Sequence, residues 1–231
     1  MTTQDIEHSW QGSLFDDEAE GYSVRPIAPQ ETYSLLLNIH YAKRIPSIVH
    51  SFGLFLNGDL RGVITYGIPP SPTLCRGVCG ESWAPMVLEL NRLCLIHNSR
   101  FEAGRLVGAS LRLLPRPTIV VSYADTAQDH VGIVYQATNF LYTGITKPRI
   151  EWTVRGLEHL HNKSIWDIAD EAGDGSLEAV KQMFGDRFYY RDRSQKHRYV
   201  YLVGSRSQRR AMRQDLNYDV LDYPKERGGS E

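Results

Sequence analysis

Apolar and polar residues alternate along residues 88–95, as expected for a β-strand with one buried face. The alternation changes parity once, across Asn91-Arg92. The apolar positions on either side of that change are Leu88, Leu90, Leu93 and Leu95. A change of parity within one strand indicates an inserted residue, a β-bulge, which moves the strand away from its neighbour and leaves backbone N–H groups unpaired. The pattern therefore predicts a bulged, splayed strand pair that opens a gap for a ligand.

A helix is expected directly after this strand. Asn98 and Ser99 are both good N-cap residues, and small or apolar residues follow at helical spacing from Ala103 to Leu114. The free N–H groups and the positive end of such a helix predict an anion site. The next apolar run, 118–124, is typical of a strand that carries Asp125 at its carboxyl end, where α/β sheets place their chemistry.

The rest of the chain predicts further elements of an α/β domain. A helix is expected over 31–43 with Leu35, Leu36 and Ile39 inward, and Asn57-Gly58 predicts a tight hairpin. The proline-containing stretch 69–85 indicates a long loop with a substrate or lid role. The other expected elements are strands over 22–27, 149–154 and 196–203, a second helix with Tyr135 and Tyr142 on one face, short helices opened by Ser164 and Ser176, and a closing helix with arginines at helical spacing.

These elements predict one domain with a mixed central sheet and flanking helices. It would cover residues 21–225, with a helical and basic insertion over 155–195. Residues 1–20 are expected to form a mobile acidic tail, and 226–231 a second tail.

Composition narrows the function only a little. The 231 residues carry 26 Lys and Arg against 27 Asp and Glu, a formal net charge of -1, so the total charge does not indicate nucleic-acid binding. The charges are unevenly placed, however, with acids crowded at 16–20 and bases at 187–213. This asymmetry indicates either a polyanionic partner or a solvated face.

The cysteine pattern and hydropathy bear on location. Cys75, Cys79 and Cys94 form an odd, sparse set without the second ligand pair that a structural zinc needs, which suits a reducing compartment. The chain shows no signal peptide and no apolar run near about 18 residues. We expect a protein of the cytoplasm with no membrane partner.

The order of these elements resembles the GNAT acyltransferase fold. That family binds the phosphates of its acyl donor with a loop of Arg or Gln, two residues, Gly, any residue, and Gly or Ala. The segment Arg105-Leu-Val-Gly108-Ala-Ser110 matches the pattern loosely, with Ser at the last position and the whole segment inside the expected helix.

Longer segments resemble the Mom family of phage DNA-modification proteins. They are His40-Tyr41-Ala-Lys-Arg44-Ile-Pro46, Glu89-Leu-Asn91-Arg92-Leu93, Val121-Ser122-Tyr123-Ala-Asp125, Tyr135-Gln-Ala-Thr-Asn139-Phe-Leu-Tyr142-Thr-Gly144, and the ending Lys196-His197-Arg198-Tyr199 through Tyr223-Pro224-Lys225. The resemblance covers about residues 25–225. It implies modification of adenine N6 in duplex DNA to a carbamoylmethyl form that protects against restriction. It also brings in iron as a candidate cofactor, although the sequence shows no spacing of two His and one carboxylate.

The resemblance and the expected elements together give candidate catalytic residues. Asp125 is the first candidate for a general base or for binding the adenine amino group, and its alternative role is to cap the loop that follows. Two tyrosines are candidates to protonate a leaving group, and Tyr142 is preferred to Tyr135. The alternative role for each is packing in the core. The remaining catalytic candidates are Ser122, His40 and Tyr41.

Two further sets of residues are expected to hold substrates. The donor would be an acyl-CoA or an aminoacyl compound, and its candidate residues are Asn91, Arg92, Leu93, Arg100, Arg105, Gly108, Ser110 and Asn139. The candidates for contacting DNA are Arg44, Tyr66, Tyr123, Arg187, Arg191, Lys196, Arg206, Arg209, Arg210 and Arg213. Tyr41, Tyr66 and Trp83 are candidates to stack on an extruded base.

Two alternatives to DNA modification stay open. The chain could be an acetyltransferase for a protein or a small-molecule amine, or a DNA-binding module without catalysis. The expected partners are duplex DNA and the acyl donor, with a homodimer left open.

Overall fold

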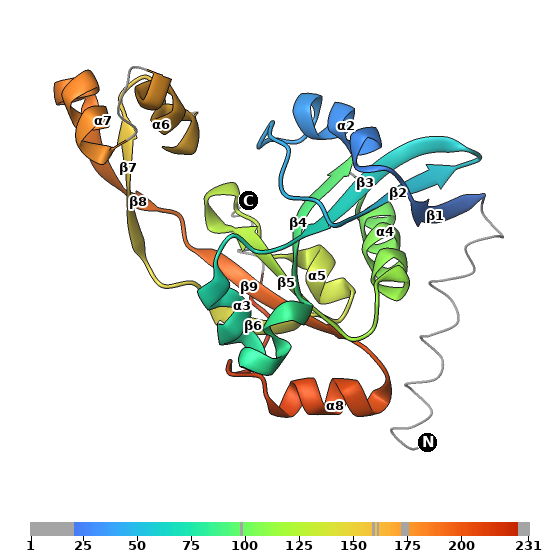
Figure 1. Cartoon of the computed structure of the whole chain (residues 1–231). Coiled ribbons are helices and arrows are strands. Elements are labelled where there is room, and N and C mark those ends of the chain that lie inside the picture. The colour runs from blue at the N-terminus through green and yellow to red at the C-terminus, as the bar shows by residue number, and fades with distance from the viewer. Residues whose placement is uncertain (1–20, 98, 159, 161, 172–175, 226–231) are drawn as a thin grey trace, which may run out of the picture.

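The computed structural model describes residues 21–97, 99–158, 160, 162–171 and 176–225. The expected tails at 1–20 and 226–231, and the cap residue Asn98, lie outside the described residues. Figure 1 shows a body built on one large sheet, and an arm that stands out from it on a two-stranded ribbon.

The large sheet has seven strands in the order β1-β2-β3-β4-β5-β9-β6. β4 and β5 run parallel, and the other neighbours are antiparallel. The strands are β1 Tyr22–Pro26, β2 His50–Leu56, β3 Asp59–Gly67, β4 Val87–Leu95, β5 Thr118–Asp125, β6 Leu141–Ile145 and β9 Lys196–Val203. The expected mixed α/β class is therefore confirmed, and Leu56 pairs with Asp59 across the predicted hairpin turn.

The predicted bulge lies at Asn91. On β3, Thr65 pairs with Arg92 and the next residue, Tyr66, pairs with Leu90, so that Asn91 is the extra residue. The parallel pairing of β4 with β5 covers only Val87–Leu90 and Ile119–Ser122, although both strands continue beyond it. The two strands are thus splayed where the parity change predicted a gap.

Helices cover both faces of this sheet (Figure 1). Leu106, Val107 and Leu111 of α4 (Arg100–Leu113) pack on one face together with Tyr135 of α5 (Ile133–Ala137). Val78 of α3 (Pro72–Cys79) and Met212 of α8 (Arg206–Gln214) pack on the other. The remaining elements of the body are α2 Tyr33–Asn38 and the 3-10 turns η1 Pro29–Thr32, η2 Glu81–Met86 and η3 Thr126–Gln128.

The arm has its own small sheet and core. It consists of β7 Arg149–Val154, α6 Asn162–Glu171, α7 Leu177–Phe184, η4 Gly185–Arg187 and β8 Phe188–Arg193. Val154, Ile165, Ala169 and Val180 form a buried cluster separate from the main core. The expected strand over 149–154 is confirmed, but it pairs with β8 outside the large sheet. The Ser176 cap is also confirmed, whereas the first helix begins at Asn162, before Ser164.

Three expectations about elements were wrong. The helix over 31–43 ends at Asn38, and Ile39 is 49% exposed. The stretch 69–85 is largely helical, because Ser71 caps α3, Pro72 stands at its first turn, and Cys75 and Val78 bury one face. The second helix ends at Ala137, because Asn139 adopts a positive φ of 61°, and Tyr142 lies in β6.

Candidate active site

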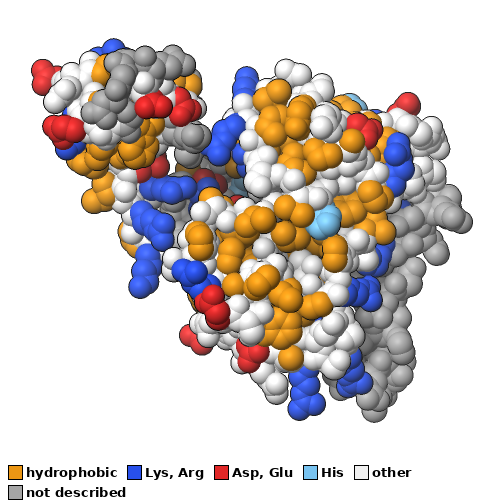
Figure 2. Space-filling view, viewed as in Figure 1, with side chains coloured by type: hydrophobic (Ala, Val, Ile, Leu, Met, Phe, Trp, Pro, Cys, Tyr) orange, Lys and Arg blue, Asp and Glu red, His pale blue; other side chains and the backbone are white. Residues whose placement is uncertain are grey.

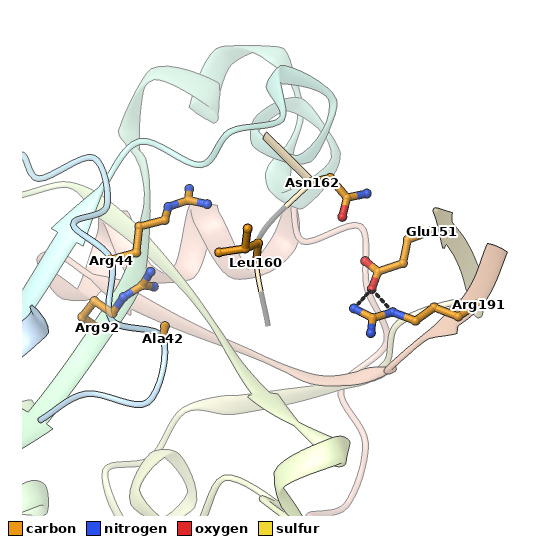
Figure 3. A pocket seen from close by; sticks show the side chains of 7 residues that line it. All are labelled: Ala42, Arg44, Arg92, Glu151, Leu160, Asn162 and Arg191. Carbon is orange, nitrogen blue, oxygen red and sulfur yellow. Dashed lines mark hydrogen bonds and ion pairs between the residues drawn. The ribbon is translucent and has the colours of Figure 1, made fainter. Parts of the chain in front are cut away.

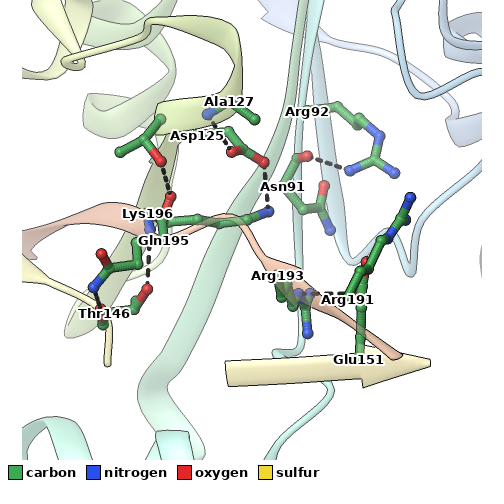
Figure 4. A network of polar contacts seen from close by, with 11 residues as sticks. Asn91, Arg92, Asp125, Ala127, Thr146, Glu151, Arg191, Arg193, Gln195 and Lys196 are labelled. Carbon is green, nitrogen blue, oxygen red and sulfur yellow. Dashed lines mark hydrogen bonds and ion pairs between the residues drawn. The ribbon is translucent and has the colours of Figure 1, made fainter. Parts of the chain in front are cut away.

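The splay of β4 and β5 brings several polar side chains together at one end of the sheet. We call this group the splay site. It comprises Glu89, Asn91 and Arg92 of β4, Ser122 and Asp125 of β5, Tyr135 of α5, His40 and Tyr41 from the turn after α2, and Lys196 of β9. Figure 4 shows that Lys196 reaches across to Asp125, with Asn91 and Arg92 beyond it.

The bulge itself is held by the Asn91 side chain. Its Oδ1 accepts a hydrogen bond from Thr65 Oγ1 at 2.6 Å, and its Nδ2 donates to the Ser47 carbonyl at 2.8 Å. The side chain that was expected to hold the donor therefore joins β4 to the loop that leads to β2. Beyond the bulge, Ile96 donates its N–H to Arg61 of the β3 side. Alternation along the strand then directs the backbone groups of Leu93 and Leu95 toward the gap.

Arg92 presents an unused donor at this place. Its Nη1 donates to the Asn91 carbonyl at 2.6 Å, while its Nε is buried with no hydrogen-bond partner in the described part of the chain. Burial lowers the pKa of Arg92. A buried donor without a partner is costly, which makes Arg92 a candidate to bind a carbonyl or an anion of a ligand.

Asp125 is held by its neighbours in the ionised form. It accepts a hydrogen bond from the Ala127 N–H at 3.0 Å and pairs with Lys196 Nζ at 3.3 Å. Burial would raise the pKa of Asp125, but hydrogen bonds from Ser194 and Ala127 and the charge of Lys196 outweigh it, so the pKa is lowered. Both expected roles, a cap and a site residue, are compatible with this geometry. A lowered pKa makes Asp125 a weak base and a good hydrogen-bond acceptor.

Glu89 is a site residue that the sequence reading missed. It pairs with Val121 on β5, which places it on the same face of the sheet as Asp125. Burial raises the pKa of Glu89, and Lys196 and Arg92 oppose that shift only in part. Two carboxyls on one face thus have pKa values moved in opposite directions, a pattern typical of acid–base pairs. The available signal was a charged residue between Leu88 and Leu90 in an otherwise buried strand.

The structure separates the two candidate tyrosines. Tyr135 is buried, its hydroxyl pairs with Ser122, and burial raises its pKa to about 12. Tyr142 lies two strands from β5, where its hydroxyl is 2.9 Å from His197 Nδ1 and its carbonyl accepts from Leu221. Their rings contact Tyr199 with centroid distances of 5.3 and 5.2 Å, but they do not share a helix. Tyr135, not Tyr142, therefore belongs to the splay site.

His40 and Tyr41 form a stacked pair at the edge of the site. Their ring centroids are 4.4 Å apart. Burial, together with the charge of Arg92, lowers the pKa of His40 to about 4, and its Nδ1 accepts the Ala42 N–H, so the ring is neutral near pH 7. Tyr41 is 65% exposed. The Tyr41 ring is therefore exposed to solvent, and the uncharged His40 ring stacks on its buried side.

Some candidates expected to touch substrates are instead internal. Tyr66 is 0% exposed, and its hydroxyl lies 2.7 Å from Ser110 Oγ, which is also fully buried. Arg105 lies over the rings of Tyr22 and Phe101. Arg105, Gly108 and Ser110 of the loose phosphate-loop pattern lie inside helix α4 and not in a loop. Trp83 donates to Asp215 at 2.7 Å and packs near α3 and α8.

The start of α4 is a less open anion site than expected. The Ser99 side chain caps it by accepting the Glu102 N–H, as predicted. The buried carboxylate of Glu102 lies in the first turn, where it binds Arg61 at 3.1 Å and Tyr22 at 3.2 Å. An internal acid therefore already interacts with the positive end of this helix, although Arg100 beside it is exposed.

The basic candidates for DNA fall in different places. Arg44 and Arg191 line a cleft of about 260 Å³ between the body and the arm. Arg187 lies at the far end of the arm, where it donates to the Arg155 carbonyl. Tyr123 is partly buried, and Asn139 is exposed in the turn after α5. The α8 set, Arg206, Arg209, Arg210 and Arg213, is exposed at the opposite end of β9 from Lys196.

The described ranges contain neither a metal centre nor a membrane-spanning helix. There, no group of three His, Cys, Asp or Glu side chains could hold a metal ion, so the donor set does not fit iron. Within the same ranges, no helix has the length and apolar character needed to cross a membrane.

Comparison with known proteins assigns the family. The model of the Mom protein family matches residues 21–225. The chain belongs to the Mom protein family. Methylcarbamoylase mom of Escherichia phage Mu is 28% identical over 142 residues, which is 58% of this chain and 58% of that relative's length.

Solved acetyltransferases align with most of this Mom-family chain at TM-scores below 0.5. A GNAT-family acetyltransferase from Bacillus cereus aligns with 80% of this chain and 99% of its own, with a TM-score of 0.41 and 10% identity. NAA60 of Arabidopsis thaliana, solved with a bisubstrate analogue, aligns with 80% of this chain and 99% of its own, with a TM-score of 0.45 and 12% identity.

The family segments converge in space in this Mom-family protein. The segment that begins at His40 supplies the stacked rings, the segment around Asn91 supplies the bulge, and the segment ending in Asp125 supplies the opposite strand. The segment that begins at Tyr135 supplies a buried hydroxyl. Residues far apart in sequence thus meet at one gap in the sheet.

Proposed function

We propose that this Mom-family chain is a transferase that converts adenine N6 in duplex DNA to a carbamoylmethyl form, a phage DNA modification that protects against restriction. The observation that carries the proposal is the splay site, where the family segments meet at a gap beside a cleft lined by arginines. The phage Mu relative is a methylcarbamoylase, which supports the same reaction.

The donor is an activated acyl compound, a thioester or an aminoacyl ester, bound in the gap. The backbone groups of Leu93 and Leu95 face this gap and suit an extended donor chain. Arg92, whose buried Nε lacks a partner among the described residues, binds the donor carbonyl and stabilises the negative charge that forms there.

The acceptor is an adenine turned out of the duplex. N6 is enclosed in the base stack, so an enzyme that reacts there has to extrude the base and hold it on aromatic surface. Tyr41 is the exposed candidate, since Tyr66 is fully buried. Asp125, kept ionised by Lys196, accepts a hydrogen bond from the N6 amino group and orients it.

Two groups have pKa values suited to moving protons. Glu89 takes the proton that N6 loses as it attacks, because its raised pKa makes it a stronger base than Asp125. Tyr135 stays protonated near neutral pH and donates to the leaving group. We therefore assign the base to Glu89, the acid to Tyr135 and the orienting contact to Asp125.

Acyl transfer does not directly give the carbamoylmethyl product, because that group is joined to N6 through CH2. A rearrangement resolves the conflict. N6 first accepts a glycyl group, and the glycyl amine then attacks C6 through a five-membered ring. The bond from C6 to the original nitrogen breaks, and that nitrogen leaves as the terminal amide. No alkylating agent is needed, and the protein supplies position and proton transfer.

Isotope labelling tests both the reaction and its order. DNA with heavy nitrogen at adenine N6 is modified by the protein in cells or extract, and its nucleosides are analysed by mass spectrometry. We expect a carbamoylmethyl adenine whose label lies in the terminal amide. A label that stays bonded to C6 would exclude the rearrangement but keep the modification. Unmodified DNA from cells that express the folded protein well would exclude the proposed function itself.

A further inference from the structure

The β7–β8 ribbon of the arm has two chemically different faces. Cross-strand partners share a face, and β7 pairs with β8 from Arg149↔Arg193 to Val154↔Phe188. One face carries Ile150, Trp152, Val154, Phe188, Tyr190 and Asp192, and the other carries Arg149, Glu151, Thr153, Tyr189, Arg191 and Arg193. The apolar face packs α6 and α7 at its far end, where Trp152 contacts Trp166 and stacks on Phe188. Near the body the arm buries neither face, since Ile150 and Tyr190 are exposed on one and Arg149 and Arg193 on the other.

This basic face is oriented toward the splay site. Arg191 and Glu151 line the cleft of about 260 Å³ whose other wall is formed by Arg44 and Arg92 of the body (Figure 3). Figure 2 shows Lys and Arg side chains on both sides of the hollow between the arm and the body. An anionic ligand seated in this cleft would meet guanidinium groups from both walls.

The root of the arm is fixed to the site residues. The Lys196 N–H donates to Thr146 Oγ1 at 2.9 Å, and Gln195 Nε2 donates to the Thr146 carbonyl at 2.6 Å. Lys196 is also the residue whose ammonium group pairs with Asp125 at 3.3 Å. The ribbon therefore leaves the body directly beside Asp125, so a ligand lying along it ends at the splay site (Figure 4).

Glu151 neutralises this face internally. Its Oε1 accepts from Arg191 Nε at 3.0 Å and lies 2.9 Å from Nη2, and its Oε2 lies 3.8 Å from Arg193 Nε. Both arginines remain partly solvent-exposed, and exposed ion pairs of this kind contribute little stability. A phosphate can therefore replace the carboxylate without a large cost to the fold.

We propose that the basic face of the arm clamps the DNA duplex through Arg149, Arg191 and Arg193, with Glu151 as an internal counter-ion that the phosphates displace. This deepens the proposed function and rests on it. A two-stranded ribbon has the width that a major groove admits, and its alternate residues repeat at about 6.6 Å along each strand. Contacts of this kind position the duplex and carry no sequence information.

Salt-dependent binding tests the clamp. Binding of a fluorescent 30-base-pair duplex is measured by anisotropy over a series of salt concentrations for wild type, Arg149→Gln/Arg191→Gln/Arg193→Gln, and the matched control Arg206→Gln/Arg209→Gln/Arg213→Gln. Each phosphate contact adds about 0.9 to the slope of log affinity against log salt, so the arm variant should lose about 2–3 from that slope. The α8 control should keep the wild-type slope. An arm variant with unchanged affinity and slope would overturn the inference.

A single substitution tests the clamp separately, in case the triple arginine variant fails to fold. Glu151→Gln keeps every arginine but removes their internal counter-ion, and we expect it to bind the duplex several-fold more tightly at low salt. Weaker binding by this variant, with an unchanged melting temperature, would also overturn the clamp. If wild type itself binds no duplex, the proposed function fails. If wild type binds and both arm variants behave like it, only the clamp fails.

Discussion

The arm and helix α8 are both rich in arginine, yet they stand at opposite ends of the same strands. The arm leaves the body where Asp125 pairs with Lys196, and α8 follows the end of β9 where Thr118 pairs with Val203. These ends are seven residue steps apart along β5, about 23 Å at the usual rise per residue. Charge alone identifies both surfaces, whereas only the arm borders the splay site. Position relative to the gap, rather than the number of arginines, therefore distinguishes them.

The largest effect should come from the chemistry at the arm's end of the sheet. Glu89→Gln removes the proposed base, and we expect modification to fall by about 10²–10⁴-fold, with duplex binding unchanged. Wild-type activity should decline on acidification through a pKa above 4.5, the ordinary value for Glu, since burial raises the pKa of Glu89 and only its ionised form accepts a proton. Single-turnover modification measured against pH checks both points. Asp125→Asn is the matched control, and a larger loss there would return the base to Asp125.

A smaller effect is expected at the aromatic edge of the splay site. Tyr41→Ala removes the exposed ring on which the extruded base would stack, worth about 1–3 kcal/mol per base, so modification should fall roughly tenfold. Tyr41→Phe keeps the ring and should retain most activity. Because phosphate contacts remain, the salt slope of duplex binding should not change in either variant. Equal losses in both would point to the hydroxyl and contradict stacking.

The smallest effect on activity is expected at a residue on neither basic surface. Tyr66→Phe removes a buried hydroxyl that lies 2.7 Å from Ser110 Oγ, while Ser110 keeps its bond to the Val107 carbonyl. The free energy of unfolding should fall by about 1 kcal/mol, and DNA binding should not change. Chemical denaturation and anisotropy measure the two quantities. A loss of binding without a loss of stability would show that Tyr66 reaches DNA after all.

The sequence predicted the features that depend on local pattern. The parity change located the bulge at Asn91, the Ser99 cap located the start of α4, and β9 has the predicted bounds. Each of these follows from periodicity or capping within a few residues, which needs no knowledge of the tertiary neighbours.

The features that were missed depend on long-range contacts. Arg187 and Arg191 were interpreted only as DNA contacts, and strand β8 was missed because its partner strand lies well before it in sequence. Tyr66 and Ser110 were assigned to different substrates, although packing of α4 on the sheet brings them together. Glu89 stands out locally only as a charge between Leu88 and Leu90, and its altered pKa depends on burial by the surrounding fold.

The side-chain amide of Asn91 joins the bulge in β4 to the loop between α2 and β2. Asn91 is the extra residue of the bulge, and its side chain also donates a hydrogen bond to the Ser47 carbonyl, a few residues after the His40-Tyr41 pair. Gly67 permits this approach, since a Cβ there would collide with the Ser47 carbonyl. The hydrogen bond from Asn91 to Ser47 therefore sets the distance between the donor site at the gap and the site of the extruded base. Related chains that vary this spacing should do so by changing the residues at 47, 67 and 91 in concert.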